Sequence, residues 1–163
     1  MSLFENSEYQ WRETYFIHFD EKNRPSADAV TAALKAIDPR YEIQNARANE
    51  AGQLESLTLY SPDDYAAMDI TFVDGEDVQE QMPQLIKELL ELAAPDEIEK
   101  IRMIEASNCR FDIYHFEQLV FVGKTDANDE DDFMDPGALL IVMQELAEVC
   151  HGIVVDPQGN TVL

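Results

Sequence analysis

Residues 53 to 73, which read QLESLTLYSPDDYAAMDITFV, decide the fold. Hydrophobic residues occupy every second position from Met68 to Phe72, the period of a strand that buries one of its faces. Leu57 and Leu59 follow the same period in the run before it. Because the turn-forming segment Ser61 to Asp64 lies between the two runs, this stretch predicts an antiparallel hairpin.

A third strand precedes this hairpin. The run from Tyr41 to Ala48 is separated from it by Asn49 to Gly52, where a glycine can supply the positive φ that a hairpin loop needs. The sequence therefore predicts an antiparallel meander of three strands over residues 41 to 73.

The rest of the chain alternates helical and strand patterns around this meander. Before it, a strand over 15–20 leads to a helix over 26–37, with Ser26 as its N-cap. After it, hydrophobic spacings of three and four predict a long helix over 74–93, in which Pro83 indicates either a start near Met82 or a kink. The remaining predicted elements are a hairpin over 100–106 and 110–116, an apolar run at 119–122, a third helix that begins at Asp135 and Pro136 and stops at His151 and Gly152, and a closing hairpin over 153–155 and 161–163.

These patterns predict an α+β fold, a two-layer sandwich of three helices packed on a mainly antiparallel sheet, ferredoxin-like or duplicated ferredoxin-like. We expect a single domain over 1–163, with 1–14 as a flexible N-terminal arm and 124–135 as an acidic loop, because no linker composition divides the chain. The sequence opens without a basic segment and contains no apolar run of membrane length. We therefore expect a cytoplasmic location.

The charge of the chain is unusual in size and in distribution. There are 34 Asp and Glu residues against 11 Lys and Arg, a formal net charge of -23. No basic residue occurs within 48–86 or within 125–163, and each stretch carries nine carboxylates. Such a surface repels phosphate backbones and anionic lipids, so we expect no binding to nucleic acid or membranes and a basic protein as the favoured partner. The alternative is that the acidity serves only solubility or adaptation to salt.

Candidate residues for binding a partner lie in the first of these stretches. They are Asp63, Asp64, Asp74, Glu76 and Asp77. The first two fall in a turn and the other three at the start of a helix. Because carboxylates are favoured at both kinds of position for local reasons, a purely structural role is the alternative.

The second stretch contains six carboxylates within ten residues, Asp126 to Asp135, and clustered oxygen ligands suit Ca²⁺ or Mg²⁺. The candidate ligands are Asp126, Asp129, Asp131, Asp132 and Asp135. The segment fails the pattern of an EF-hand loop, since Asp131 stands where that loop has Gly and Gly137 where it has Glu. A solvated loop without metal is the favoured alternative, and no cofactor is predicted.

Signatures of catalysis are missing. Cys109 and Cys150 are in no metal-binding spacing, and of the three histidines only His18 and His115 are placed to approach one another, across a sheet. Phosphate-binding loops and common hydrolase motifs do not occur. The sequence thus favours a non-catalytic interaction protein that binds a basic partner in the manner of an immunity protein, antitoxin or inhibitor. The alternative is a divalent-metal-dependent enzyme with ligands in the acidic loop.

Overall fold

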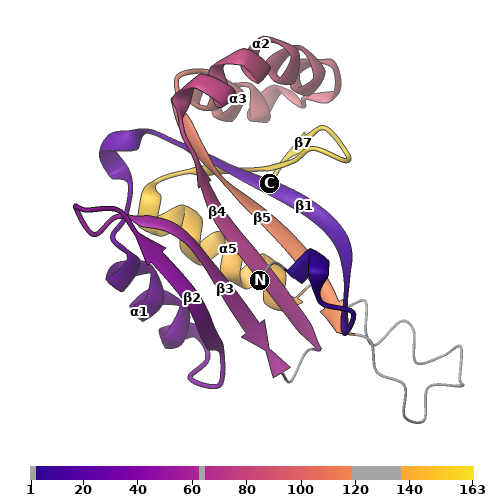
Figure 1. Cartoon of the computed structure of the whole chain (residues 1–163). Coiled ribbons are helices and arrows are strands. Elements are labelled where there is room, and N and C mark those ends of the chain that lie inside the picture. Colours follow the sequence, from indigo (N-terminus) through magenta and orange to yellow (C-terminus); the bar gives the residue numbers. More distant parts are fainter. Residues whose placement is uncertain (1–2, 63–64, 119–136) are drawn as a thin grey trace, which may run out of the picture.

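The computed structural model of the protein describes residues 3–62, 65–118 and 137–163. In these residues the chain forms one sheet of seven strands in the order β2-β3-β4-β5-β1-β6-β7 (Figure 1). The strands are β1 (Tyr9–Phe19), β2 (Glu42–Ala48), β3 (Leu54–Ser61), β4 (Ala66–Val73), β5 (Cys109–Gln118), β6 (Ile153–Asp156) and β7 (Thr161–Val162). The helices are α1 (Ala27–Ile37), α2 (Gly75–Leu92), α3 (Ile98–Glu105) and α5 (Gly137–Cys150). Every strand pair is antiparallel, so the α+β class and the antiparallel sheet are as predicted.

The predicted meander is present as β2, β3 and β4. Leu57 pairs with Ile70 and Leu59 with Met68, so the hydrophobic positions of the two runs share one face of the sheet. The predicted N-cap of α1 is confirmed, since the Ser26 side chain accepts a hydrogen bond from the Ala29 amide at 3.0 Å. Short-range periodicity and capping were therefore sufficient to locate these elements. The predicted start of the third helix at Asp135 and Pro136 lies outside the described residues.

One predicted strand is wrong. Residues 98–105 form helix α3 in place of the first strand of a hairpin, so the described chain has four helices rather than the predicted three. The β-branched isoleucines of this segment favour a strand, but Ile101 and Ile104 are spaced for one face of a helix and both are buried. They pack with α2, which lies before α3 in the chain.

Two boundaries differ from the prediction. Strand β1 begins at Tyr9, which pairs with Gln118, so part of the predicted N-terminal arm belongs to the sheet. Helix α2 starts at Gly75 and contains Pro83, so the predicted alternative of a start near Met82 is wrong. The predicted run at 119–122 and the acidic loop lie outside the described residues.

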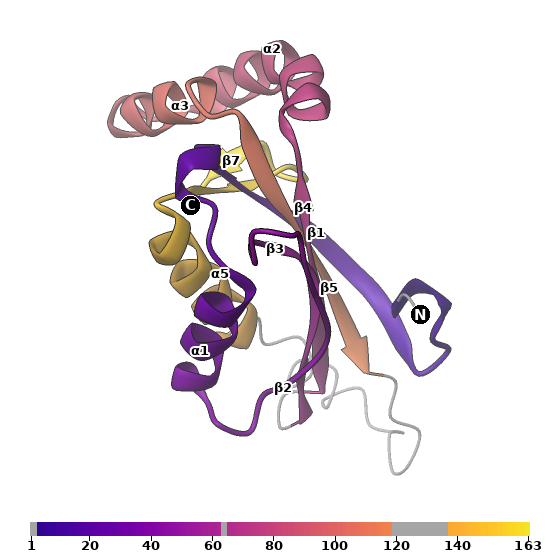
Figure 2. The same ribbon diagram turned by 60° about the vertical axis from the view of Figure 1, so that its left-hand side comes forward.

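Helices α1 and α5 lie together on one face of the sheet (Figure 2). The side chains that point to them from the strands include Ile17, Leu59, Ile70 and Phe111, which are fully buried and form the main core with both helices. We call the side of the sheet on which α1 and α5 lie the covered face.

None of the helices in the described parts of the chain is both long and apolar enough to cross a membrane.

Helices α2 and α3 lie beyond one end of the long strands, stacked on β6 and β7 (Figures 1 and 2). They form a second core with Val155 and Val162 and with the half-buried Phe16 and Val73. Phe16 and Val73 belong to the opposite face of the sheet, whose residues alternate with those of the covered face. This second core therefore places α2 beside the opposite face, where the candidate site lies.

Candidate functional site

The solvent side of α2 carries most of the described acidic residues of the first basic-free stretch. Asp74, Glu76, Asp77 and Glu80 are exposed there, and further along the helix Glu88 is half-buried and Glu91 exposed. Lys87 is the only basic residue of α2. We call this set of six carboxylates the α2 ridge.

Local structural roles explain only part of this set of carboxylates. Asp74 occupies the N-cap position of α2, but its side chain makes no capping hydrogen bond. Glu76 and Asp77 lie in the first turn, where the unpaired amides of the helix favour negative charge. Helix capping thus does not account for Asp74, while the helix dipole accounts in part for the other two.

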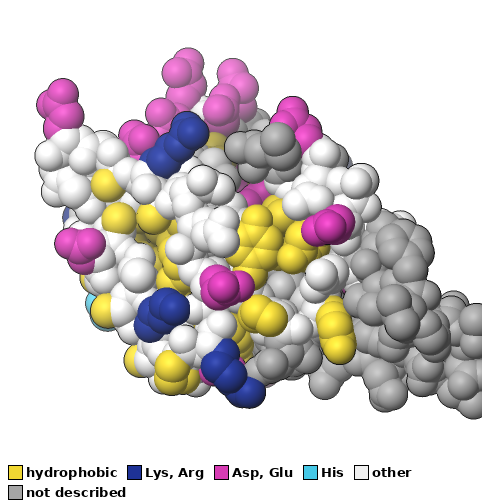
Figure 3. All heavy atoms as spheres, turned by 60° about the horizontal axis from the view of Figure 1, so that its bottom comes forward, with side chains coloured by type: hydrophobic (Ala, Val, Ile, Leu, Met, Phe, Trp, Pro, Cys, Tyr) yellow, Lys and Arg dark blue, Asp and Glu magenta, His cyan; other side chains and the backbone are white. Residues whose placement is uncertain are grey.

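The structure does not bring all predicted site residues together. Of the partner-binding candidates, Asp63 and Asp64 lie outside the described residues, as do the metal candidates Asp126, Asp129, Asp131, Asp132 and Asp135. The described carboxylates of the second basic-free stretch are Glu145 and Glu148 on α5 and Asp156 in β6. Since α5 lies on the covered face, Glu145 and Glu148 do not share a surface with the α2 ridge, whereas Asp156 directly precedes Pro157 in the turn beside α2. On the face shown in Figure 3, basic side chains also lie among the carboxylates.

A groove of about 410 Å³ runs beside the ridge, between α2, the opposite face of the sheet and the turn that joins β6 to β7. Its walls combine apolar side chains, Phe16, Leu85 and Pro157, with the carboxylates of Glu80 and Glu88. The Gln84 amide donates a hydrogen bond to Glu88 Oε1 at 2.8 Å, which restrains that carboxylate. The groove thus offers negative charge beside apolar surface.

Arg110, which lines the groove, belongs to a buried ion pair. Arg110 on β5 is only 6% exposed. Its Nε donates to Asp112 Oδ1 at 2.7 Å, its Nη1 donates to Gln81 Oε1 at 2.7 Å, and its guanidinium lies 4.0 Å from the centroid of the Phe16 ring. Burial raises the pKa of the Asp112 carboxyl, and the nearby Arg110 charge opposes that rise. This network holds α2 against the sheet through Gln81.

Sequence reasoning missed Arg110 and Asp112. The signal was present: both are charged residues within a strand pattern whose intervening positions, Cys109, Phe111 and Ile113, are apolar. Charges at the inward positions of a strand must be paired or exposed, and here they pair with one another.

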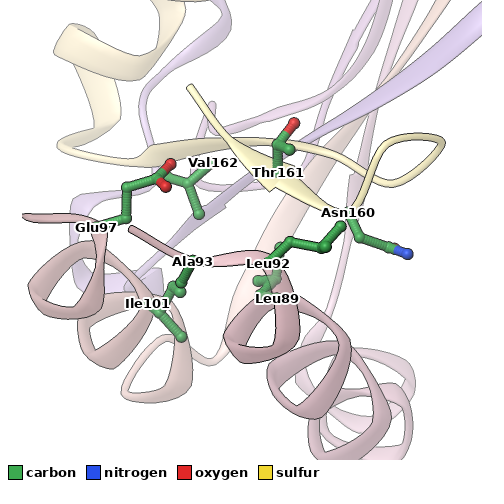
Figure 4. Close-up of a pocket in the computed structure, with 8 residues that line it drawn as sticks. All are labelled: Leu89, Leu92, Ala93, Glu97, Ile101, Asn160, Thr161 and Val162. Atoms are coloured by element: carbon green, nitrogen blue, oxygen red, sulfur yellow. The ribbon is translucent and has the colours of Figure 1, made fainter. Parts of the chain in front are cut away.

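The other described hollows are poorer candidates. The one between α2, α3 and β7 measures about 10 Å³ and is lined by the side chains in Figure 4, so it holds at most one water molecule. A hollow of about 480 Å³ near Arg24 mixes three carboxylates with two guanidinium groups. Arg24 is already engaged there, with its Nε and Nη2 on the Leu54 carbonyl at 3.2 and 2.9 Å and its guanidinium over Phe72.

The two cysteine thiols are unsuited to act as nucleophiles. Burial raises the pKa of both the Cys109 and Cys150 thiols to about 12, so neither forms a thiolate near neutral pH. His18 and His115 do not meet, because His18 pairs with Arg110 and His115 with Glu13, and the two rings point to opposite faces of the sheet. Among the described residues, no three His, Cys, Asp or Glu side chains are grouped so that they could hold a metal ion.

Comparison with known proteins gave no match: no family model matches the chain, and neither a curated protein nor a solved structure is significantly similar to it.

Proposed function

We propose that this is a non-catalytic interaction protein whose α2 ridge docks on a basic surface of a partner protein, in the manner of an immunity protein, antitoxin or inhibitor. The observation that carries the proposal is the composition of the exposed side of α2, six carboxylates against Lys87 alone. Complementary charge of this kind speeds association and selects partners of opposite sign. Nucleic acid and anionic membranes are disfavoured for the same reason.

The groove beside the ridge supports the same proposal. An arginine or lysine side chain has an apolar stem, which packs on apolar surface, and a cationic head, which is stabilised by negative charge. Phe16, Leu85 and Pro157 provide apolar surface for the stem, and Glu80 and Glu88 provide charge for the head. Arg110 also lines the groove, and its positive charge is paired with Asp112 at 2.7 Å.

The proposal is tested with a charge-reversed ridge, Glu76→Lys with Glu80→Lys. The matched control is Glu50→Lys with Glu148→Lys, which changes the net charge equally at exposed positions outside α2. Binding of a blocked hexa-arginine peptide is measured by fluorescence anisotropy in about 50 and 500 mM salt, conditions that bracket strong and weak screening. We expect the ridge variant to lose about tenfold in affinity at low salt, and the control to lose much less.

Two results would contradict the proposal. Equal losses in the two variants would show that bulk charge, not the ridge, attracts the peptide. Affinity of the unaltered protein that does not change with salt would show that its binding is not electrostatic.

Two finer predictions from the sequence stay predictions. A divalent-metal-dependent enzyme would take its ligands from 126–135, outside the described residues, and calorimetric titration with Ca²⁺ and Mg²⁺ tests it. A ferredoxin-like arrangement, single or duplicated, has in its favour that α1 and α5 share one face. Against it, three strands lie between β1 and β2, the strands that α1 connects.

A further inference from the structure

The opposite face of the sheet carries two rows of residues that lie away from the α2 ridge. Strand pairing across β2, β3, β4, β5 and β1 aligns Glu42, Tyr60, Ala67, Phe116 and Trp11 in one row. The same pairing aligns Gln44, Thr58, Asp69, Tyr114 and Thr14 in the next row. None of these residues is basic, and three of them are large aromatic residues that are exposed or half-buried.

The aromatic rings form a connected surface. The rings of Tyr60 and Tyr9 lie 5.7 Å apart at an angle of 59°, and both pack on the small cluster of Leu3, Ala67 and Phe116. Tyr114 packs on the same cluster from β5. We call Tyr9, Tyr60 and Tyr114 the tyrosine face.

Carboxylates lie among these rings. Asp69 pairs directly with Tyr114 across β4 and β5, and its Oδ1 accepts a hydrogen bond from Thr58 Oγ1 at 2.6 Å. Its Oδ2 accepts a longer hydrogen bond from the Leu3 amide at 3.4 Å. Both of its partners are neutral, so its negative charge is oriented but not neutralised by them.

Burial, with a smaller contribution from neighbouring carboxylates, affects the pKa of two of the tyrosine hydroxyls. The pKa of Tyr60 is raised, first by burial and then by the charges of Asp69 and Glu42. The pKa of Tyr114 is raised by burial and by Asp112, whose Oδ2 accepts a hydrogen bond from the Tyr114 hydroxyl at 3.4 Å. Asp69 and Glu42 thus add negative charge near the Tyr60 hydroxyl, and negative charge attracts cations.

Aromatic faces next to a carboxylate are suited to one kind of side chain. Ammonium and guanidinium groups are drawn to the negative face of an aromatic ring, and a carboxylate at the same site adds a charge-assisted hydrogen bond. We propose that the tyrosine face binds a lysine or arginine side chain from an extended basic segment of a partner protein, seated beside Asp69. The inference rests on the proposed function only in that the partner is basic. It assigns a surface separate from the α2 ridge.

Nuclear magnetic resonance tests the site directly. The protein is titrated with blocked hexa-arginine while the ring resonances of Tyr9, Tyr60 and Tyr114 are followed, and blocked hexa-citrulline serves as the uncharged control peptide. We expect hexa-arginine to shift these ring resonances and hexa-citrulline to leave them unchanged. Ring resonances that do not move would overturn the inference, whatever happens at α2.

Variants separate charge from ring contact. Asp69→Asn removes the charge but keeps an oxygen for Thr58, and we expect it to weaken the binding seen at the ring resonances about fivefold. Asp96→Asn, an equal change at an exposed position on the turn Pro95–Glu97, serves as its control and is expected to have little effect. Tyr60→Leu is expected to weaken the same binding, and Tyr60→Phe to retain it, because only the latter keeps the aromatic face. Equal affinities of Asp69→Asn and Asp96→Asn would contradict the inference.

The charge-reversed ridge variant distinguishes this inference from the proposed function. If its tyrosine resonances still shift with hexa-arginine, the tyrosine face binds cations independently of α2. If the same resonances change on dilution of the protein without peptide, a second copy of the chain occupies the face and the inference is overturned.

Discussion

His18 makes the stability of the protein dependent on pH. It is 2% exposed on β1, and neither of its ring nitrogens has a hydrogen-bond partner among the described residues. Burial, with a smaller contribution from the charge of Arg110 on the adjacent strand, lowers its pKa from 6.5 to about 3. The folded protein therefore keeps this ring neutral at pH values where the unfolded chain protonates it.

The sign and size of the effect follow from this difference. Below pH 6.5 the unfolded state binds a proton that the folded state does not, so the free energy of unfolding falls as the pH falls, until about pH 3. One unit of pKa difference corresponds to about 1.4 kcal/mol. Between pH 7.5 and 4, protonation of His18 alone should cost about 3 kcal/mol of stability.

Replacement of the ring removes this cost. His18→Leu deletes two buried nitrogens that lack partners, so we expect the variant to be at least as stable as the unaltered protein at pH 7.5. The difference in free energy of unfolding between the variant and the unaltered protein should be about 3 kcal/mol more in favour of the variant at pH 4 than at pH 7.5. Urea denaturation of both proteins at several pH values measures the difference between their free energies of unfolding. The titration of the many carboxylates cancels in this difference because both proteins contain them.

His151→Asn is the matched control, because His151 is exposed and has a φ of 54°, which asparagine tolerates. Its stability difference from the unaltered protein should not change with pH as that of His18→Leu does. A His18→Leu difference that stays constant from pH 7.5 to 4 would refute the reasoning, because it would mean that folding does not suppress protonation of His18.

Two further predictions concern buried groups. Arg110→Met leaves the Asp112 carboxylate buried without its cation, so we expect a loss of about 3 kcal/mol in urea denaturation at pH 7, and partial recovery when Asp112→Asn is added. A loss below about 1 kcal/mol would show that the pair is not structural. Cys109 and Cys150 are buried thiols with a pKa raised to about 12, so a thiol reagent such as dithionitrobenzoate should react with both only after unfolding. Rapid reaction of the native protein would contradict their burial.

Some residues of the candidate site could be predicted from neighbouring residues in the sequence, and others depend on contacts between distant parts of the chain. Asp74, Glu76 and Asp77 could be named from the sequence because an acidic helix start is visible in consecutive residues. Arg110 and Asp112 were missed because their importance depends on the helix that covers them, and on Gln81, which is 29 residues away from Arg110. The alignment of Asp69 with Tyr114 likewise exists only after β4 and β5 pair.

The sequence by itself determined the meander, the helix after Ser26 and the end of α5, because period, capping and turn formation depend on residues within a few positions of one another. Tertiary structure decided that residues 98–105 form a helix, since Ile101 and Ile104 are buried against α2. It also decided where the charge lies. The α2 ridge is separated from Glu145 and Glu148 because α5 packs on the covered face and α2 beside the opposite one, a placement set by strand order and not by the spacing of acidic residues.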